Sequence, residues 1–149
     1  MTKLKQIEDF LAAQPIAMAG ASSNPKKFGF AAFRELKEKG MNILPVNPHA
    51  EEIHQVKVFH TLKDLPSEVK SLIIMTRKDQ TLALVREAKD LGFKNVWVQQ
   101  NSESPEVLKE LEGSGMNYIT KQCVLMYFKP HGVHKFHIAI KKLFGGYPK

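Results

Sequence analysis

Short apolar runs alternate with segments of helical periodicity along most of the chain. Three of the runs are "IAMAG" (16–20), "SLIIMT" (71–76) and "NVWVQ" (95–99), and none alternates polar and apolar residues as a half-exposed strand would. Strands buried on both faces are typical of parallel sheets, whose connections cross over through helices. The pattern therefore predicts an α/β fold, an open parallel sheet with helices on both faces.

The predicted elements follow from this pattern and from Pro and Gly punctuation. Strands are expected at residues 16–20, 42–48, 56–59, 71–76, 95–99 and 117–120. Helices are expected at residues 3–13, 24–40, 79–91, 104–113 and 131–143. Asn24 and Asp79 are the expected N-caps, although the second helix could start as late as Gly29. Phe30, Phe33 and Leu36 are expected to face the sheet.

Composition indicates a single domain spanning residues 1–149, long enough for a substantial core. No segment reads as a transmembrane span or a secretory signal. The single cysteine, Cys123, forbids an intrachain disulfide and fits a reducing compartment. We therefore expect a cytoplasmic protein without membrane association.

The net charge of +7 is unevenly distributed. Residues 121–149 contain six lysines and no acidic residue, so the rest of the chain is nearly neutral. This distribution argues against a nucleic-acid-binding domain with charge on every face, and it permits one basic patch for an anionic small molecule or a polyanion.

The turn after the first predicted strand, residues 20–24, is the expected ligand site. In open α/β sheets, ligands lie at the carboxyl ends of the strands near the switch in strand order. Gly20 permits close backbone approach, and N–H groups at the following helix start can hold phosphate oxygens. Lys26 and Lys27 could neutralise charge. The alternative is a plain turn with solvent-facing lysines.

The turn does not fit the common nucleotide motifs. The dinucleotide fingerprint needs three closely spaced glycines, but after Gly20 the next glycine is Gly29. The second strand ends in Val46-Asn47-Pro48-His49, without the acid that binds the NAD ribose. A Walker A loop is also absent. The turn therefore predicts a phosphate ligand, but neither NAD nor ATP in the usual manner.

Four motifs resemble those of the CoA-binding Rossmann-fold family, whose small stand-alone members are similar to the N-terminal domain of the succinyl-CoA synthetase alpha subunit. They are "GASSNPKKFGF", "ILPVNP", "VWVQ" and "KQCVLMY", in matching order and spacing over about residues 14–128. The resemblance implies a single-domain Rossmann-like fold and a site for CoA or an acyl-CoA.

The same resemblance implies roles for individual residues. Gly20, Ala21 and Ser22 would lie against the pyrophosphate, with Lys27 and Phe28 beside it. The nucleotide would be bordered by Asn47 and Pro48. Thr76, Arg77 and Gln99 would lie at the same crevice. Independently, Lys26, Lys27 and Arg77 lie in loops at the expected sheet edge, where each could contact a phosphate of CoA or remain a solvated surface charge.

Two positions depart from the family pattern. Asn101 replaces a common glycine, and the turn is expected to survive because Asn can adopt a left-handed backbone. A common acid after the cysteine is replaced by Tyr127 or Phe128, which puts any chemistry dependent on that acid in doubt.

Neither a catalytic constellation nor a complete metal site is evident. Cys123 has two interpretations. In one, its thiol meets the CoA thiol or forms a mixed disulfide with it; in the other, which the sequence favours, it is a small buried hydrophobe. His131, His134 and His137 are better explained by a basic helix than by metal ligation, because their spacing spreads them over a wide arc. A third interpretation places His134 or His137 at a subunit interface, so a homo-oligomer stays possible.

Three functions remain open. The favoured one is a small CoA-binding protein without catalysis, acting as a carrier, sensor or regulatory module. The alternative is an NAD(P)- or acyl-CoA-dependent enzyme or subunit, for which a chain of 149 residues leaves little room for a second substrate domain. A polyanion-binding module ranks last, because exposed aromatic interleaving and a known nucleic-acid motif are missing.

Overall fold

Five parallel strands form the main sheet in the order β2-β1-β5-β6-β7. The structure, a computed structural model, describes residues 2–129, so the expected helix 131–143 and its histidines lie outside the described residues. The strands of this sheet are β1 (Ile16–Ala19), β2 (Ile43–Val46), β5 (Ser71–Ile74), β6 (Asn95–Gln99) and β7 (Asn117–Gln122). The sheet confirms the predicted α/β, Rossmann-like class.

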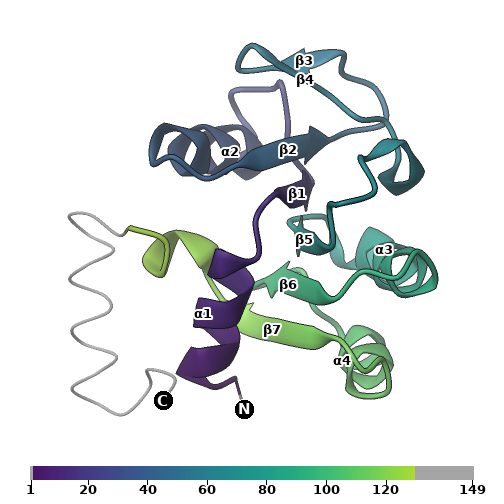
Figure 1. The fold of residues 1–149 in the computed structure, drawn as a ribbon. Coiled ribbons are helices and arrows are strands. Elements are labelled where there is room, and N and C mark those ends of the chain that lie inside the picture. Colours follow the sequence, from purple (N-terminus) through teal and green to yellow (C-terminus); the bar gives the residue numbers. More distant parts are fainter. Residues whose placement is uncertain (1, 130–149) are drawn as a thin grey trace.

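Within the described part of the chain, four α-helices cover the two faces of the sheet (Figure 1). They are α1 (Leu4–Ala12), α2 (Phe28–Glu38), α3 (Lys78–Asp90) and α4 (Pro105–Glu112). The helices α1 and α2 share one core cluster with Met18, Ile73 and Trp97, and α3 and α4 share the other with Ile74 and Val98. Two fully buried layers explain why the strands read as continuous apolar runs.

A β-hairpin and two 3-10 helices complete the described chain. The strands β3 (Glu52–Ile53) and β4 (Val56–Lys57) pair antiparallel, and two 3-10 helices follow later, η1 (Leu62–Asp64) and η2 (Val124–Met126). The prediction of a strand at 56–59 is therefore only partly right, because Val56 and Lys57 belong to the hairpin. Phe59 makes an isolated bridge to Val46.

Both expected N-caps are wrong. Lys27 caps α2 and Arg77 caps α3, and neither makes a side-chain capping bond. The Asn24 carboxamide oxygen instead accepts a hydrogen bond from Lys26 N at 3.0 Å, an Asx turn that delays the helix. The later start near Gly29, which the sequence left open, is closer to the structure.

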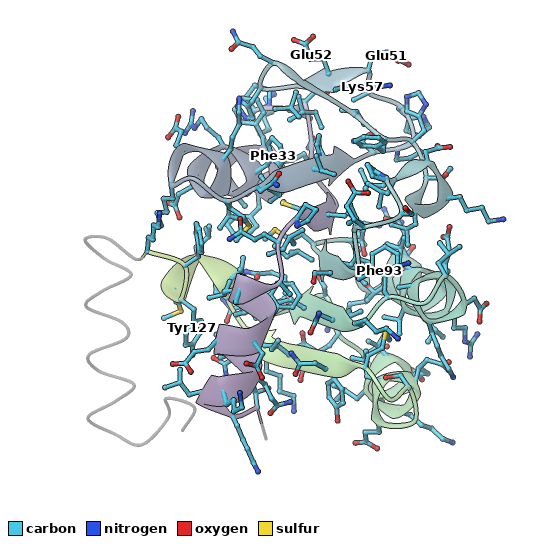
Figure 2. All side chains as sticks on the ribbon, viewed as in Figure 1. Phe33, Glu51, Glu52, Lys57, Phe93 and Tyr127 are labelled. Atoms are coloured by element: carbon cyan, nitrogen blue, oxygen red, sulfur yellow. The ribbon has the colours of Figure 1, made fainter. Side chains whose placement is uncertain are left out.

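The side chains of α2 also differ in part from the prediction. Phe33 and Leu36 are fully buried against the sheet. Phe30, by contrast, lies against the imidazole of His54 in the hairpin, with ring centroids 4.2 Å apart. The hairpin therefore shields part of the outer surface of α2. Its residues Glu51, Glu52 and Lys57 lie at the end of the molecule farthest from β7 (Figure 2).

Within residues 2–129, the helices are all too short or too polar to cross a membrane.

Candidate functional site

The carboxyl ends of five parallel strands meet at one edge of the sheet. The chain passes from β1 to β2 on one side, and then to β5 on the other, so the strand order switches between β1 and β5. A crevice at such a switch is the usual ligand position in this fold class. The residues predicted from sequence lie in the loops at this edge, or at the adjoining ends of β6 and α2: Gly20, Ala21, Ser22, Lys26, Lys27, Phe28, Asn47, Pro48, Thr76, Arg77, Gln99 and Cys123.

Two glycines shape the turn between β1 and α2. Gly20 has a φ of +97°, and a Cβ there would lie 2.5 Å from the Met75 carbonyl oxygen. A Cβ on Gly29 would collide with the Gly20 carbonyl oxygen and come within 3.0 Å of the Gly20 carbonyl carbon. The first turn of α2 therefore lies directly against the turn that follows β1, as close helix–strand packing requires.

The rest of this turn is held by its own polar groups. The Ser22 hydroxyl oxygen accepts a hydrogen bond from Asn24 N at 3.0 Å, and Lys27 N donates to Asn24 O at 3.0 Å. These bonds fix the path of the backbone into α2. In its first turn Phe30 N donates to Lys27 O at 3.1 Å, and the N–H groups before Phe30 have no partner within the helix. A preformed turn that ends in a helix N-terminus suits an anion.

Three consecutive residues beside this turn are exposed: Lys26, Lys27 and Phe28. Phe28 is the one exposed large hydrophobic residue among residues 2–129, with 54% of its surface open to solvent. Two cations and an aromatic ring next to a helix N-terminus form a surface that can contact both a phosphate and an apolar group of one ligand.

The side chain of Asn47 joins the loop after β2 to the turn after β1 by hydrogen bonds. Its Nδ2 donates to Ala21 O at 2.9 Å, and its Oδ1 accepts from His49 N at 2.8 Å and from Ala50 N at 3.0 Å. All three bonds are to backbone, so this side chain positions both loops. Pro48 lies exposed beside it.

Thr76 begins a directed chain of hydroxyl hydrogen bonds. Thr81 Oγ1 donates to the Arg77 carbonyl oxygen at 3.1 Å, which uses its single proton. The 2.9 Å contact between the two threonine hydroxyls must therefore be donated by Thr76. Having donated its proton to Thr81, the Thr76 hydroxyl can only accept a further hydrogen bond. It therefore suits an N–H or O–H group of a ligand better than a phosphate oxygen.

Arg77 is paired with Asp79. Its Nη2 and Nε lie 2.7 Å and 3.2 Å from the two carboxylate oxygens, a fork geometry that a phosphate could also occupy. The hydrogen bond from Arg77 and its charge lower the pKa of Asp79, and Asp79 raises the pKa of Arg77 in the same way. Both side chains are exposed, so water screens the pair and a competing anion can displace it.

Gln99 links the end of β6 to the segment after β7. Its Oε1 accepts a hydrogen bond from Val124 N at 3.1 Å, and the side chain is buried. The indole Nε1 of Trp97 donates to Gln122 O at 3.0 Å, and the Tyr127 hydroxyl donates to Gln122 Oε1 at 2.7 Å. Tyr127 lies on the α1 side of the sheet and Phe93 on the α3 side (Figure 2).

Cys123 directly follows β7 and is 6% exposed. It belongs to the core cluster that includes Val124 and Leu125. This environment is that of a small buried hydrophobe, as the sequence favoured. Residues 2–129 contain no group of three or more His, Cys, Asp or Glu side chains placed to hold a metal ion.

Sequence reasoning missed two features of the site. The sequence predicts Gly29 only as a possible helix start, yet Gly29 permits the contact with Gly20. Its place in the first turn of a predicted helix, after a turn that contains a glycine, is a signal of this role. The sequence predicts Asp79 as an N-cap, and its pairing with Arg77, two residues earlier, leaves no distinctive pattern in the sequence.

These observations define a Rossmann-like domain in which a preformed turn leads into a helix N-terminus at the switch in strand order. Residues 14–129 match the profile of the CoA binding domain, and the chain belongs to this family.

The relatives include both large ligases and small proteins. Over 129 residues, the chain is 31% identical to the alpha subunit of the acetate–CoA ligase (ADP-forming) II of Pyrococcus furiosus, a match covering 79% of this chain and 28% of that subunit. An uncharacterised Bacillus subtilis protein is 25% identical, covering 73% of this chain and 81% of its own length. The solved structure of a conserved hypothetical protein from Pyrococcus furiosus has a TM-score of 0.71 and 35% identity, covering 74% of this chain and 95% of that one.

Proposed function

We propose that the chain binds CoA or an acyl-CoA at the carboxyl edge of its sheet and does so without catalysing a reaction. The observation that supports this most directly is the turn at Gly20, pressed against the first turn of α2 at the switch in strand order. Membership of the CoA-binding domain family points to the same ligand. Residues 1–149 would then act as one ligand-binding domain, a carrier, sensor or regulatory module.

Each group of edge residues has a role in this proposal. The pyrophosphate lies against Gly20, Ala21 and Ser22, within reach of the exposed ammonium groups of Lys26 and Lys27. The adenosine half extends toward Asn47 and Pro48 at the end of β2. Arg77 exchanges its carboxylate partner for a phosphate oxygen. The arm that ends in the thiol extends the other way, across β5 and β6 toward Gln99 and Cys123.

Isothermal titration calorimetry of the reduced protein against CoA, acetyl-CoA, NAD and NADP tests this proposal. We expect CoA or acetyl-CoA to bind and Lys27→Ala to weaken binding by about threefold to tenfold, the usual effect of one exposed charged contact. Lys63→Ala is the matched control, because Lys63 is exposed and lines a cavity beside Leu91 and Phe93 at the C-terminal end of α3. Binding of NADP alone would instead favour the oxidoreductase alternative, and binding of none of the four ligands would refute the proposal.

A further inference from the structure

Among residues 2–129, the side-chain amide nitrogen of Gln99 has no hydrogen-bond acceptor. Gln99 is 4% exposed, and its Oε1 is fixed by the hydrogen bond from Val124 N. A backbone N–H can only donate, so the oxygen must face Val124 and the nitrogen must point the other way. Nε2 makes no hydrogen bond to any residue of the described range 2–129.

This amide nitrogen is nevertheless accessible from outside. Within residues 2–129, the side-chain polar atom that is both fully covered and unpartnered is Glu103 Oε2. Gln99 Nε2 therefore keeps contact with solvent although the rest of the side chain is buried. The Gln99 amide therefore presents two N–H hydrogens at the sheet edge, and its orientation is fixed by the hydrogen bond that its oxygen accepts from Val124 N.

Strand alternation places this donor on the same face as the β1–α2 turn. Gln99 lies two residues after Trp97, so both side chains point to the face covered by α1 and α2. Met75, which follows β5, packs against the same cluster and stays partly exposed. Because neighbouring strands are about 4.8 Å apart, the ends of β1 and β6 are separated by roughly 10 Å, with Met75 between them.

We propose that Gln99 donates a hydrogen bond to a carbonyl oxygen of the pantetheine arm, and that this contact selects ligands that have such an arm. This inference rests on the proposed function. The arm leaves the pyrophosphate and alternates apolar segments with two secondary amides. A ligand held by its phosphates at the Gly20 turn can lay an apolar segment on Met75 and present an amide carbonyl to Gln99 Nε2. The adenosine half extends in the opposite direction, toward β2.

The test compares Gln99→Glu with Gln100→Glu. The first change is isosteric: it keeps an oxygen for Val124 N and replaces the donor by an acceptor. The second adds the same charge at the exposed neighbouring residue, and so controls for repulsion of an anionic ligand. We expect Gln99→Glu to weaken binding of CoA and of 4′-phosphopantetheine by about tenfold or more, as for a lost hydrogen bond that leaves a group unpaired, and to change ADP binding less than twofold. Gln100→Glu should leave the ratio of CoA to ADP affinity unchanged.

A second measurement does not depend on a variant that folds. The side-chain amide resonances of Gln99 in the unaltered protein should shift on saturation with CoA and stay unshifted with ADP. Equal shifts with both ligands, an equal loss of CoA and ADP affinity in Gln99→Glu, or no loss of CoA affinity would each overturn the inference and leave CoA binding intact. Failure of the unaltered protein to bind CoA would remove the proposed function, and this inference with it.

Discussion

Replacing Gly29 by Ala tests whether the contact between α2 and the Gly20 turn shapes the site. The new methyl group would collide with the Gly20 carbonyl oxygen, and it would lie 3.0 Å from the Gly20 carbonyl carbon and 3.6 Å from the Ala21 Cα. The two atoms that are too close, the carbonyl oxygen and carbon of Gly20, belong to the backbone, so no side chain can turn away to relieve the overlap. The helix and the turn must move apart instead.

Two opposing effects set the size of the change. Ala in place of Gly favours a helix by about 1 kcal/mol. Overpacking typically costs about 1–3 kcal/mol, and a rigid backbone obstacle places this site near the upper end. The expected net loss is therefore about 2 kcal/mol, which for a domain of this size lowers Tm by roughly 4–8 °C.

Thermal unfolding followed by circular dichroism measures this loss, and CoA titration of the folded variant measures the effect on the site. Gly113→Ala is the matched control, because nothing lies within 4 Å of a Cβ at Gly113 and its φ is negative. We expect this control to unfold within about 2 °C of the unaltered protein, as surface substitutions usually do. A Gly29→Ala protein as stable as the control, with unaltered CoA affinity, would refute the reasoning.

Three further predictions concern the loops around the site. Asn47→Ala removes three hydrogen bonds to backbone, so chemical denaturation should show a loss of about 1–3 kcal/mol, and CoA affinity should fall because both loops loosen. Arg77→Gln should raise the pKa of Asp79 toward its ordinary value in an NMR titration, and an unchanged titration would contradict the pairing. Because the pKa of Asp79 is lowered in the folded protein, the pair stabilises the fold at neutral pH, and this stabilisation is lost as the pH falls through the lowered pKa. Thr76→Val should weaken CoA more than inorganic phosphate, in competition titrations, if Thr76 accepts a hydrogen bond from the ligand; equal weakening would show that it contacts a phosphate.

The order of elements could be predicted from the sequence because burial on both faces leaves a direct pattern. Runs such as 71–74 and 95–99 have no polar face, and this property alone separates a covered parallel sheet from a half-exposed one. The turn at Gly20 could also be located, because it is the first strand-to-helix connection of such a sheet.

The details that escaped prediction depend on local turn geometry and on one contact between distant residues. Asn24 has the side chain of an N-cap, but its oxygen is used by Lys26 N in a turn that precedes the helix. The β3–β4 hairpin has strands of two residues and turns at His54 and Gln55, which both have positive φ without being glycine or asparagine. The donor of Gln99 becomes available only because Val124 N, 25 residues later, occupies its oxygen.

The bulge in β7 also limits how the sheet can grow. The pairing with β6 slips by one residue between Ile119 and Gln122, and Lys121 there adopts a φ of +59°. A further strand laid along β7, the last strand of the described sheet, would miss part of its hydrogen-bond ladder at this point and meet an exposed ammonium group. Edges interrupted in this way resist pairing with other chains. At high protein concentration, the edge of β7 should therefore resist pairing with the edges of other molecules. Lys121→Val is the change that would make such aggregation easier.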